Sequence, residues 1–113
     1  MLSDQELFDK VVNHLRAQGC KALENNQCKY RTSSGLKCAA DCLIPDDMYK
    51  PSMEGINIIR VVENNPNLKY VISNPRLIIR LQYIHDWIEV MNWEESFKGV
   101  AIEFGLVYTP PAN

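Results

Sequence analysis

Apolar residues near the start of the chain recur every three or four positions, which is the spacing of one face of an α-helix. Ser3 and Glu6 stand before this stripe as a capping box, in which each side chain bonds the backbone amide of the other. Gly19 suits the left-handed position that follows a helix end. We therefore predict a helix over residues 4–18. Its apolar stripe consists of Leu7, Phe8, Val11, Val12 and Leu15.

A longer stripe in the last third of the chain has alternating spacings of four and three residues, which predict a helix over residues 75–91. Asn74 is suited to cap this helix, and Pro75 occupies its first turn, where the missing amide costs no hydrogen bond. The stripe consists of Leu77, Leu81, Ile84, Ile88 and Met91, and Ile78 and Trp87 widen it.

A further helix is predicted directly after this one. Asn92 and Glu95 have the spacing of a second capping box, and Gly105 stands where the helix would end. The apolar face of this helix consists of Phe97, Val100, Ala101 and Phe104. The last two helices would form a helical hairpin.

The middle of the chain carries weaker signals. Two alternating runs, residues 28–31 and 36–39, flank a polar loop that ends in Gly35, a pattern that predicts a β-hairpin. Residues 56–62 are rich in β-branched side chains, which favours a strand, but part of the segment also has helical spacing. Helix and strand both stay open there, with a short helix preferred.

The 113 residues are 46% hydrophobic and 23% charged, which suits one domain with its own core. We predict an α+β fold: a mostly helical single domain over residues 1–107, with a small β-hairpin and a C-terminal helical hairpin. Residues 108–113 contain Pro110 and Pro111 and are predicted to be a flexible C-terminal tail.

The formal net charge of −2 is too small to indicate general nucleic-acid binding, although acidic residues gather in the segment 86–103. The chain shows no apolar leader and no apolar run of the roughly 20 residues that a membrane span needs. We therefore expect a cytoplasmic protein with no membrane partner. Its four cysteines would then be reduced thiols.

Two cysteines, Cys38 and Cys42, are close enough in sequence to share a zinc ion, with Cys20 and Cys28 completing the ligand set. The preferred interpretation is four reduced, half-buried cysteines and no cofactor. A cysteine nucleophile would need a histidine base nearby. No catalytic residue is assigned from the sequence.

His85 and Asp86 are neighbours on the predicted helix. Side chains of adjacent helical residues point about 100° apart, so these two are not expected to form an acid–base pair. We place His85 at the rim of the core, with Glu89 as a partner one turn further on. If Trp87 is exposed beside Tyr83, that face would mark an interface, and the monomer would give way to a homodimer.

Two groups of residues are candidate binding surfaces. A loop stiffened by two prolines forms the first, because loops on a rigid scaffold often carry function. It contains Asp46, Asp47, Tyr49, Met53 and Glu54. One face of the predicted hairpin forms the second, with Lys29, Arg31 and Lys37 placed to contact the phosphates of a nucleic acid.

Several strings in the middle of the chain resemble a family of uncharacterised small proteins of tailed bacteriophages and prophages. The strings are Cys28-Lys29-Tyr30-Arg31, Gly35-Leu36-Lys37-Cys38-Ala39-Ala40, Cys42-Leu43-Ile44-Pro45-Asp46-Asp47-Met48-Tyr49 and Pro51-Ser52-Met53-Glu54-Gly55. The resemblance implies a phage or prophage origin, and with it the cytoplasm of a bacterial host cell, and it implies no catalytic residues.

The expected function is therefore that of a phage-encoded binding protein, acting on a host or phage macromolecule, with inhibition of a host defence system as one such role. Its partner would most simply be a host or phage protein. Two alternatives remain: a small metal-binding or thiol-dependent enzyme, and a nucleic-acid accessory protein.

Overall fold

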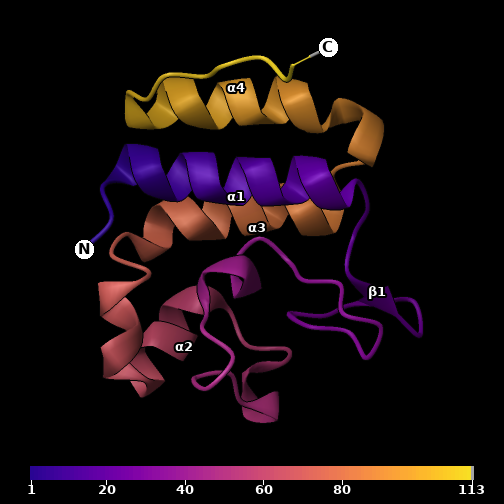
Figure 1. The fold of residues 1–113 in the computed structure, drawn as a ribbon, viewed down its shortest axis with the longest axis vertical. Helices are drawn as coiled ribbons and strands as arrows, with labels where there is room; N and C mark the ends of the chain where they lie inside the picture. The colour runs from indigo at the N-terminus through magenta and orange to yellow at the C-terminus, as the bar shows by residue number, and fades with distance from the viewer. Residues whose placement is uncertain (113) are drawn as a thin grey trace.

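Four α-helices and one two-stranded antiparallel sheet form the regular structure of residues 1–112, the part of the chain that the computed structural model describes (Figure 1). The fold is α+β and mostly helical, as predicted. In chain order the elements are α1 (Asp4–Gln18), β1 (Leu23–Glu24), β2 (Gln27–Cys28), η1 (Asp41–Leu43), η2 (Pro51–Met53), α2 (Ile58–Asn64), η3 (Pro66–Tyr70), α3 (Pro75–Trp87), η4 (Val90–Asn92) and α4 (Trp93–Phe104), where η is a 3₁₀-helix.

Helix α1 has the predicted ends. The Glu6 amide donates to the Ser3 hydroxyl over 3.1 Å, and the Ser3 amide donates to the Glu6 carboxylate over 2.9 Å, which completes the capping box. Gly19 follows the helix with a φ of 69°, a left-handed conformation that glycine adopts without steric cost. All five residues of the predicted stripe are buried.

Helix α3 is the centre of the fold, because α1, α2 and α4 all pack against it (Figure 1). Asn74 caps it as predicted, since its side chain accepts a hydrogen bond from the Leu77 amide. Leu77, Ile78 and Leu81 are completely buried, so the first half of the predicted stripe forms the core. None of the helices in residues 1–112 is long and apolar enough to cross a bilayer.

The predicted helix over residues 75–91 is too long. Helix α3 ends at Trp87, and Ile88 is extended, which turns the apolar stripe away from the core. Met91 is therefore 82% exposed, contrary to the prediction. Trp87 is still within α3 but is 74% exposed, so it does not widen the buried stripe as predicted. The chain is held in this turn by the Trp93 indole, which is buried and donates a hydrogen bond to the Ile88 carbonyl over 3.0 Å.

The start of α4 also differs from the prediction. The Asn92 side chain makes no capping hydrogen bond, so the predicted capping box with Glu95 is absent. Because η4 runs directly into α4, a 3₁₀ turn leads into the helix where a side-chain cap was expected. The end is as predicted, since Gly105 follows α4 in a left-handed conformation.

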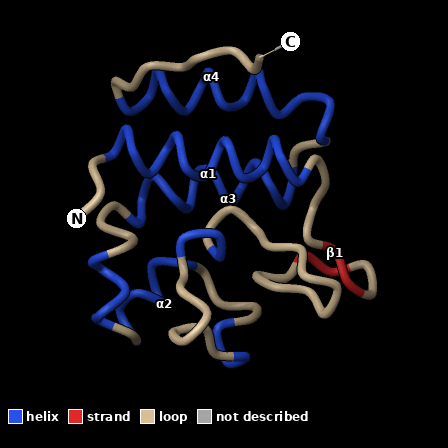
Figure 2. Tube along the Cα trace, in the orientation of Figure 1, coloured by secondary structure: helices blue, strands red, loops and turns tan. Residues whose placement is uncertain are grey.

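The sheet lies earlier in the chain than the predicted hairpin (Figure 2). Asn25 and Asn26 both have positive φ and form the tight turn between β1 and β2, a conformation that asparagine tolerates. The predicted runs do pair, but through a single bridge between Arg31 and Lys37. The Glu54 carboxylate contributes to this shortening, because it accepts a hydrogen bond from the Tyr30 amide, which the next pair of the ladder would use. It also accepts a hydrogen bond from the Arg31 amide.

The segment with two open alternatives is resolved as a helix. Its residues 58–62 belong to α2, which begins after Asn57, whose side chain accepts a hydrogen bond from the Arg60 amide. Two residues of the predicted tail are bonded to the helices, since the Tyr108 hydroxyl donates to Glu94 and the Thr109 carbonyl accepts from Arg16. The last residue of that tail, Asn113, lies outside the described residues.

Candidate functional site

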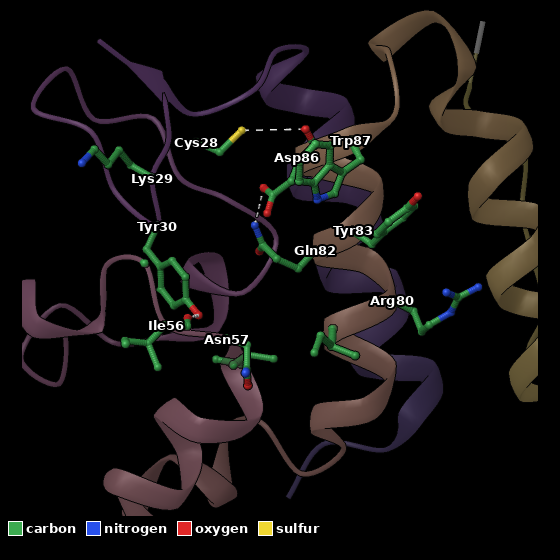
Figure 3. Close-up of a pocket in the computed structure, with 13 residues that line it drawn as sticks. Cys28, Lys29, Tyr30, Ile56, Asn57, Arg80, Gln82, Tyr83, Asp86 and Trp87 are labelled. Atoms are coloured by element: carbon green, nitrogen blue, oxygen red, sulfur yellow. Dashed lines mark hydrogen bonds between the residues drawn. The ribbon is translucent and has the colours of Figure 1, made fainter. Parts of the chain in front are cut away.

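A groove of about 410 Å³ opens along one side of α3 (Figure 3). Tyr83, Asp86 and Trp87 line it from the helix. The opposite wall comes from the segment that follows β2 and from the loop that leads into α2. The Tyr30 hydroxyl joins these two parts of the wall by donating a hydrogen bond to the Ile56 carbonyl. The groove therefore lies between the central helix and the less regular half of the molecule.

Two aromatic side chains border the groove on its helical side. Tyr83 is 52% exposed and Trp87 is 74% exposed, and their spacing of four residues places them on one face of α3. Large apolar side chains that are exposed together commonly mark an interaction surface. The structure thus meets the condition under which the sequence analysis expected an interface here. The spacing of Tyr83 and Trp87 in the sequence could have indicated this pair. The prediction placed Trp87 in the buried stripe instead.

Among the residues that line the groove, Asp86 is the charged residue whose head group faces into it. Lys29 and Arg80 also contribute to the lining, but their cationic ends point away from the groove (Figure 3). The Arg80 guanidinium is paired with Glu103 on α4 over 3.0 Å. The groove therefore combines aromatic surface with one negative charge.

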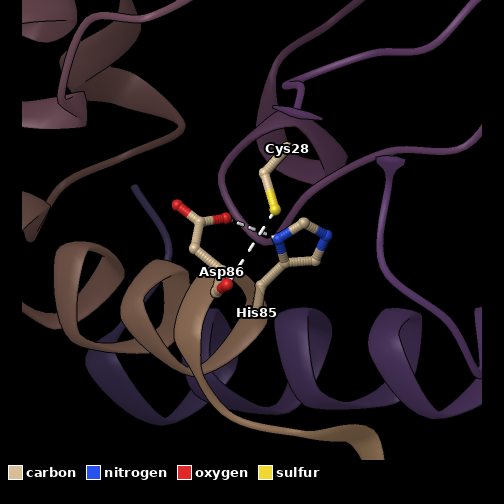
Figure 4. Close-up of side chains that lie close together, drawn as sticks. All are labelled: Cys28, His85 and Asp86. Atoms are coloured by element: carbon tan, nitrogen blue, oxygen red, sulfur yellow. Dashed lines mark hydrogen bonds and ion pairs between the residues drawn. The ribbon is translucent and has the colours of Figure 1, made fainter. Parts of the chain in front are cut away.

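At the wall of the groove, Cys28, His85 and Asp86 place a thiol, an imidazole and a carboxylate within 4.8 Å of one another (Figure 4). His85 is completely buried and its Nδ1 lies 2.7 Å from an Asp86 carboxylate oxygen. Both findings correct the sequence analysis, which placed His85 at the rim and did not pair it with Asp86. The side chains turn toward each other although their Cα–Cβ bonds diverge along the helix.

The hydrogen bonds of His85 assign its tautomer. The Ala22 amide donates to Nε2 over 2.9 Å, so Nε2 carries the lone pair. The proton is then on Nδ1, which donates to Asp86. A metal ion on Nδ1 would need a proton on Nε2, facing the Ala22 N–H, or an imidazolate. The imidazole is also without a free nitrogen to act as a base for Cys28. His85 therefore anchors the Ala22 backbone to α3 and is poorly suited to metal binding or catalysis.

Cys38 and Cys42 have structural roles, whereas Cys20 is exposed. Burial raises the pKa of Cys38 well above its ordinary value and the pKa of Cys42 to about 12. The Cys42 thiol donates a hydrogen bond to the Ala39 carbonyl over 3.1 Å. Within residues 1–112, Cys28, His85 and Asp86 form the one group of three potential metal ligands. Cys38 and Cys42, which the sequence suggested as two zinc ligands, therefore have no third ligand beside them within residues 1–112.

The thiols should consequently differ in reactivity toward a disulfide reagent. Cys20 is exposed and is expected to react first. Cys28 should follow more slowly, because burial and then the Asp86 charge raise its pKa and lower its thiolate fraction. Cys38 and Cys42 should react after unfolding. Titration of native and urea-unfolded protein, with Cys20→Ser as the control, checks this order. Rapid reaction of Cys28 in native Cys20→Ser protein would contradict the raised pKa of its thiol.

The predicted recognition loop is largely tied into the fold. The Arg31 guanidinium bonds the buried Asp41 carboxylate over 2.8 and 2.9 Å and pairs with Asp46 over 3.1 Å. It also lies over the Tyr49 ring, 4.2 Å from the centroid. The Tyr49 hydroxyl donates a hydrogen bond to the Glu54 carboxylate over 2.7 Å. The same carboxylate accepts the two backbone hydrogen bonds described above. We call this set of side chains the Arg31 network.

The other predicted binding residues are not gathered into one surface. Met53 is buried in the core, whereas Asp47 is exposed. Lys37 lies 3.4 Å from the same Asp46 oxygen that pairs with Arg31, so an acidic residue neutralises much of the predicted basic face. Lys29 remains at the groove. The hairpin residues therefore do not form the continuous basic surface that phosphate binding would need.

Comparisons of this chain with protein-family models, with curated proteins and with solved structures give no match. A functional assignment therefore has to come from the groove itself.

Proposed function

We propose that this protein is a small binding protein of a tailed phage or prophage that captures a segment of a host or phage protein in the groove beside α3. The observation that carries the proposal is the pair of exposed aromatic residues, Tyr83 and Trp87, at the border of that groove. Aromatic residues are enriched among the few side chains that dominate protein–protein affinity. Inhibition of a host defence protein is one function that such capture would serve.

The phage origin is supported by the resemblance of the middle strings and not by the groove. Those strings contain four of the five residues of the Arg31 network, namely Arg31, Asp46, Tyr49 and Glu54, and they leave out Asp41. Their side chains hold the loop against the segment after β2. The resemblance therefore speaks for a shared fold and origin, while the partner is selected by other residues.

An enzymatic function has less support, because the groups with the right chemistry are already engaged. Both nitrogens of His85 make hydrogen bonds to the protein, and burial and the Asp86 charge keep the Cys28 thiol protonated by raising its pKa. A nucleophile needs the opposite, a base with a free lone pair or a setting that lowers the thiol pKa.

A protein partner is also favoured over a nucleic acid. Asp86 faces the groove and would repel phosphates, and Asp41 and Asp46 together offset the charges of Arg31 and Lys37. A second copy of the chain is a less suitable occupant. A two-fold contact centred on Trp87 would bring Asp86 close to its own symmetry mate, and like charges facing each other across an interface are unfavourable.

Selection from a library of random peptides tests the proposal. Peptides enriched on the immobilised wild-type protein should bind at Trp87, so that Trp87→Ala weakens their binding at least tenfold, or by about 1.4 kcal/mol. Ile102→Ala on α4 is the matched control, because Ile102 is 82% exposed and does not line the groove. Fluorescence anisotropy with labelled peptides gives the affinities.

Two outcomes would contradict the proposal. Peptides that bind wild type and Trp87→Ala equally well would place the binding surface elsewhere. A wild-type protein that sediments as a dimer, and becomes monomeric on Trp87→Ala but not on Ile102→Ala, would make a second copy the occupant of the groove.

A further inference from the structure

We infer that the groove recognises an arginine side chain of the partner, with the guanidinium against the Asp86 carboxylate and the aromatic face of Trp87 beside it. This inference rests on the proposed function, since it names the chemistry by which the same groove selects its partner. It follows from the state of the Asp86 carboxylate and from the directions of the nearby charges.

The Asp86 carboxylate is fixed through one oxygen and free at the other. Its Oδ1 accepts hydrogen bonds from Nδ1 of His85 over 2.7 Å and from the Gln82 amide nitrogen over 2.8 Å. No donor within residues 1–112 is bonded to Oδ2. The side chain is 28% exposed, so the free oxygen belongs to an accessible acid at the groove.

The two groups that hold this carboxylate are themselves anchored to the backbone. Gln82 accepts a hydrogen bond from the Ala40 amide over 3.0 Å, and His85 accepts one from the Ala22 amide over 2.9 Å. The acid is therefore oriented before any ligand arrives, which lowers the conformational cost of binding. A single free carboxylate oxygen in such a position is suited to accept a charged N–H donor.

The surrounding cations leave this acceptor available. Lys29 and Arg80 point away from the groove, and the Lys21 ammonium lies 3.4 Å from the Asp86 backbone carbonyl. Trp87 follows Asp86 directly on α3 and lines the groove, whereas the Tyr83 ring leaves the helix on the side of Arg80 (Figure 3). A planar guanidinium can stack on an aromatic face and donate to a carboxylate at once, which favours arginine over lysine.

A direct experiment uses Nα-acetyl-arginine amide as the probe and Nα-acetyl-citrulline amide as its neutral counterpart of similar shape. Amide and indole resonances of the labelled protein report binding. The arginine probe should shift the Trp87 indole resonance in a saturable way, and the citrulline probe should bind at least about tenfold more weakly. Equal shifts with both probes, or none at Trp87, would overturn the inference.

Asp86→Asn supplies the matched variant, because the amide keeps an oxygen acceptor for His85 and Gln82 while it removes the charge. In this variant the preference for arginine over citrulline should disappear. The comparison of the two probes on wild type remains decisive even if Asp86→Asn does not fold.

The selected peptides separate the two proposals. Peptides that depend on Trp87 and carry an arginine, with at least tenfold weaker binding when citrulline replaces it, support both. Peptides that depend on Trp87 but bind Asp86→Asn equally well overturn the arginine inference and leave the proposed function standing. Peptides that do not depend on Trp87 overturn the proposed function, whereas the arginine probe still tests the chemistry of the groove.

Discussion

Leu81→Ala is expected to lower the free energy of unfolding by about 2–5 kcal/mol. Leu81 is completely buried on α3, the helix on which α1, α2 and α4 pack, so its truncation leaves a cavity at the centre of the fold. Urea unfolding followed by circular dichroism measures the change.

Met91→Ala is the matched control, because Met91 belongs to the same predicted stripe but is exposed in the structure. Its cost should stay within about 0.5 kcal/mol, the range of ordinary surface substitutions. Similar losses for Leu81→Ala and Met91→Ala would mean that the stripe continues into the core beyond Trp87, as the sequence pattern alone predicts, and that the end of α3 is wrongly placed.

Arg31→Met is expected to destabilise the protein by about 3 kcal/mol or more at neutral pH. The substitution keeps most of the side-chain length but leaves the Asp41 carboxylate buried without its cation. Arg80→Met is the control, because it breaks the exposed pair between Arg80 and Glu103, which should contribute less than about 1 kcal/mol. Equal costs for the two variants would argue against a buried ion pair at Asp41.

The cost of Arg31→Met should also depend on pH. Burial raises the pKa of Asp41 above its ordinary value, and the hydrogen bonds and charge of Arg31 partly oppose this rise. An acid with a raised pKa in the folded state favours folding while it is protonated, and it loses that contribution as the pH rises through the folded pKa. Without Arg31 the pKa of Asp41 rises further. The stability difference between wild type and Arg31→Met should therefore shrink as the pH falls toward 3.8, the ordinary value for this carboxyl.

The candidate site was visible in the sequence only in parts. Spacing on α3 placed Tyr83 and Trp87 together, but it did not show that both residues would be exposed. The His85–Asp86 pair was discounted because neighbouring helical residues diverge, although Nδ1 of His85 reaches the carboxylate. The partner on Nε2 is the Ala22 amide, 63 positions away in the chain, and no local pattern points to it.

The predicted loop site had a different outcome. Asp46, Tyr49 and Glu54 have the residue types of a recognition surface. In the structure, these side chains instead bind other parts of the same chain. Arg31 and Lys37 are basic, but Asp46 pairs with both of them. Residue type indicated that these groups would make strong polar contacts. It could not indicate whether the partner would be another molecule or another part of the same chain.

The sequence by itself determined the features that depend on residues within about one helical turn of each other. The capping box of Ser3 and Glu6, the left-handed end at Gly19 and the start of α3 after Asn74 are of this kind, because the interacting groups are a few bonds apart. Only the tertiary structure decided where α3 ends, which hydrogen bonds His85 and Asp86 make and which side chains border the groove. Those features depend on packing between distant segments, whose energies are shared among many contacts and leave no short pattern in the sequence.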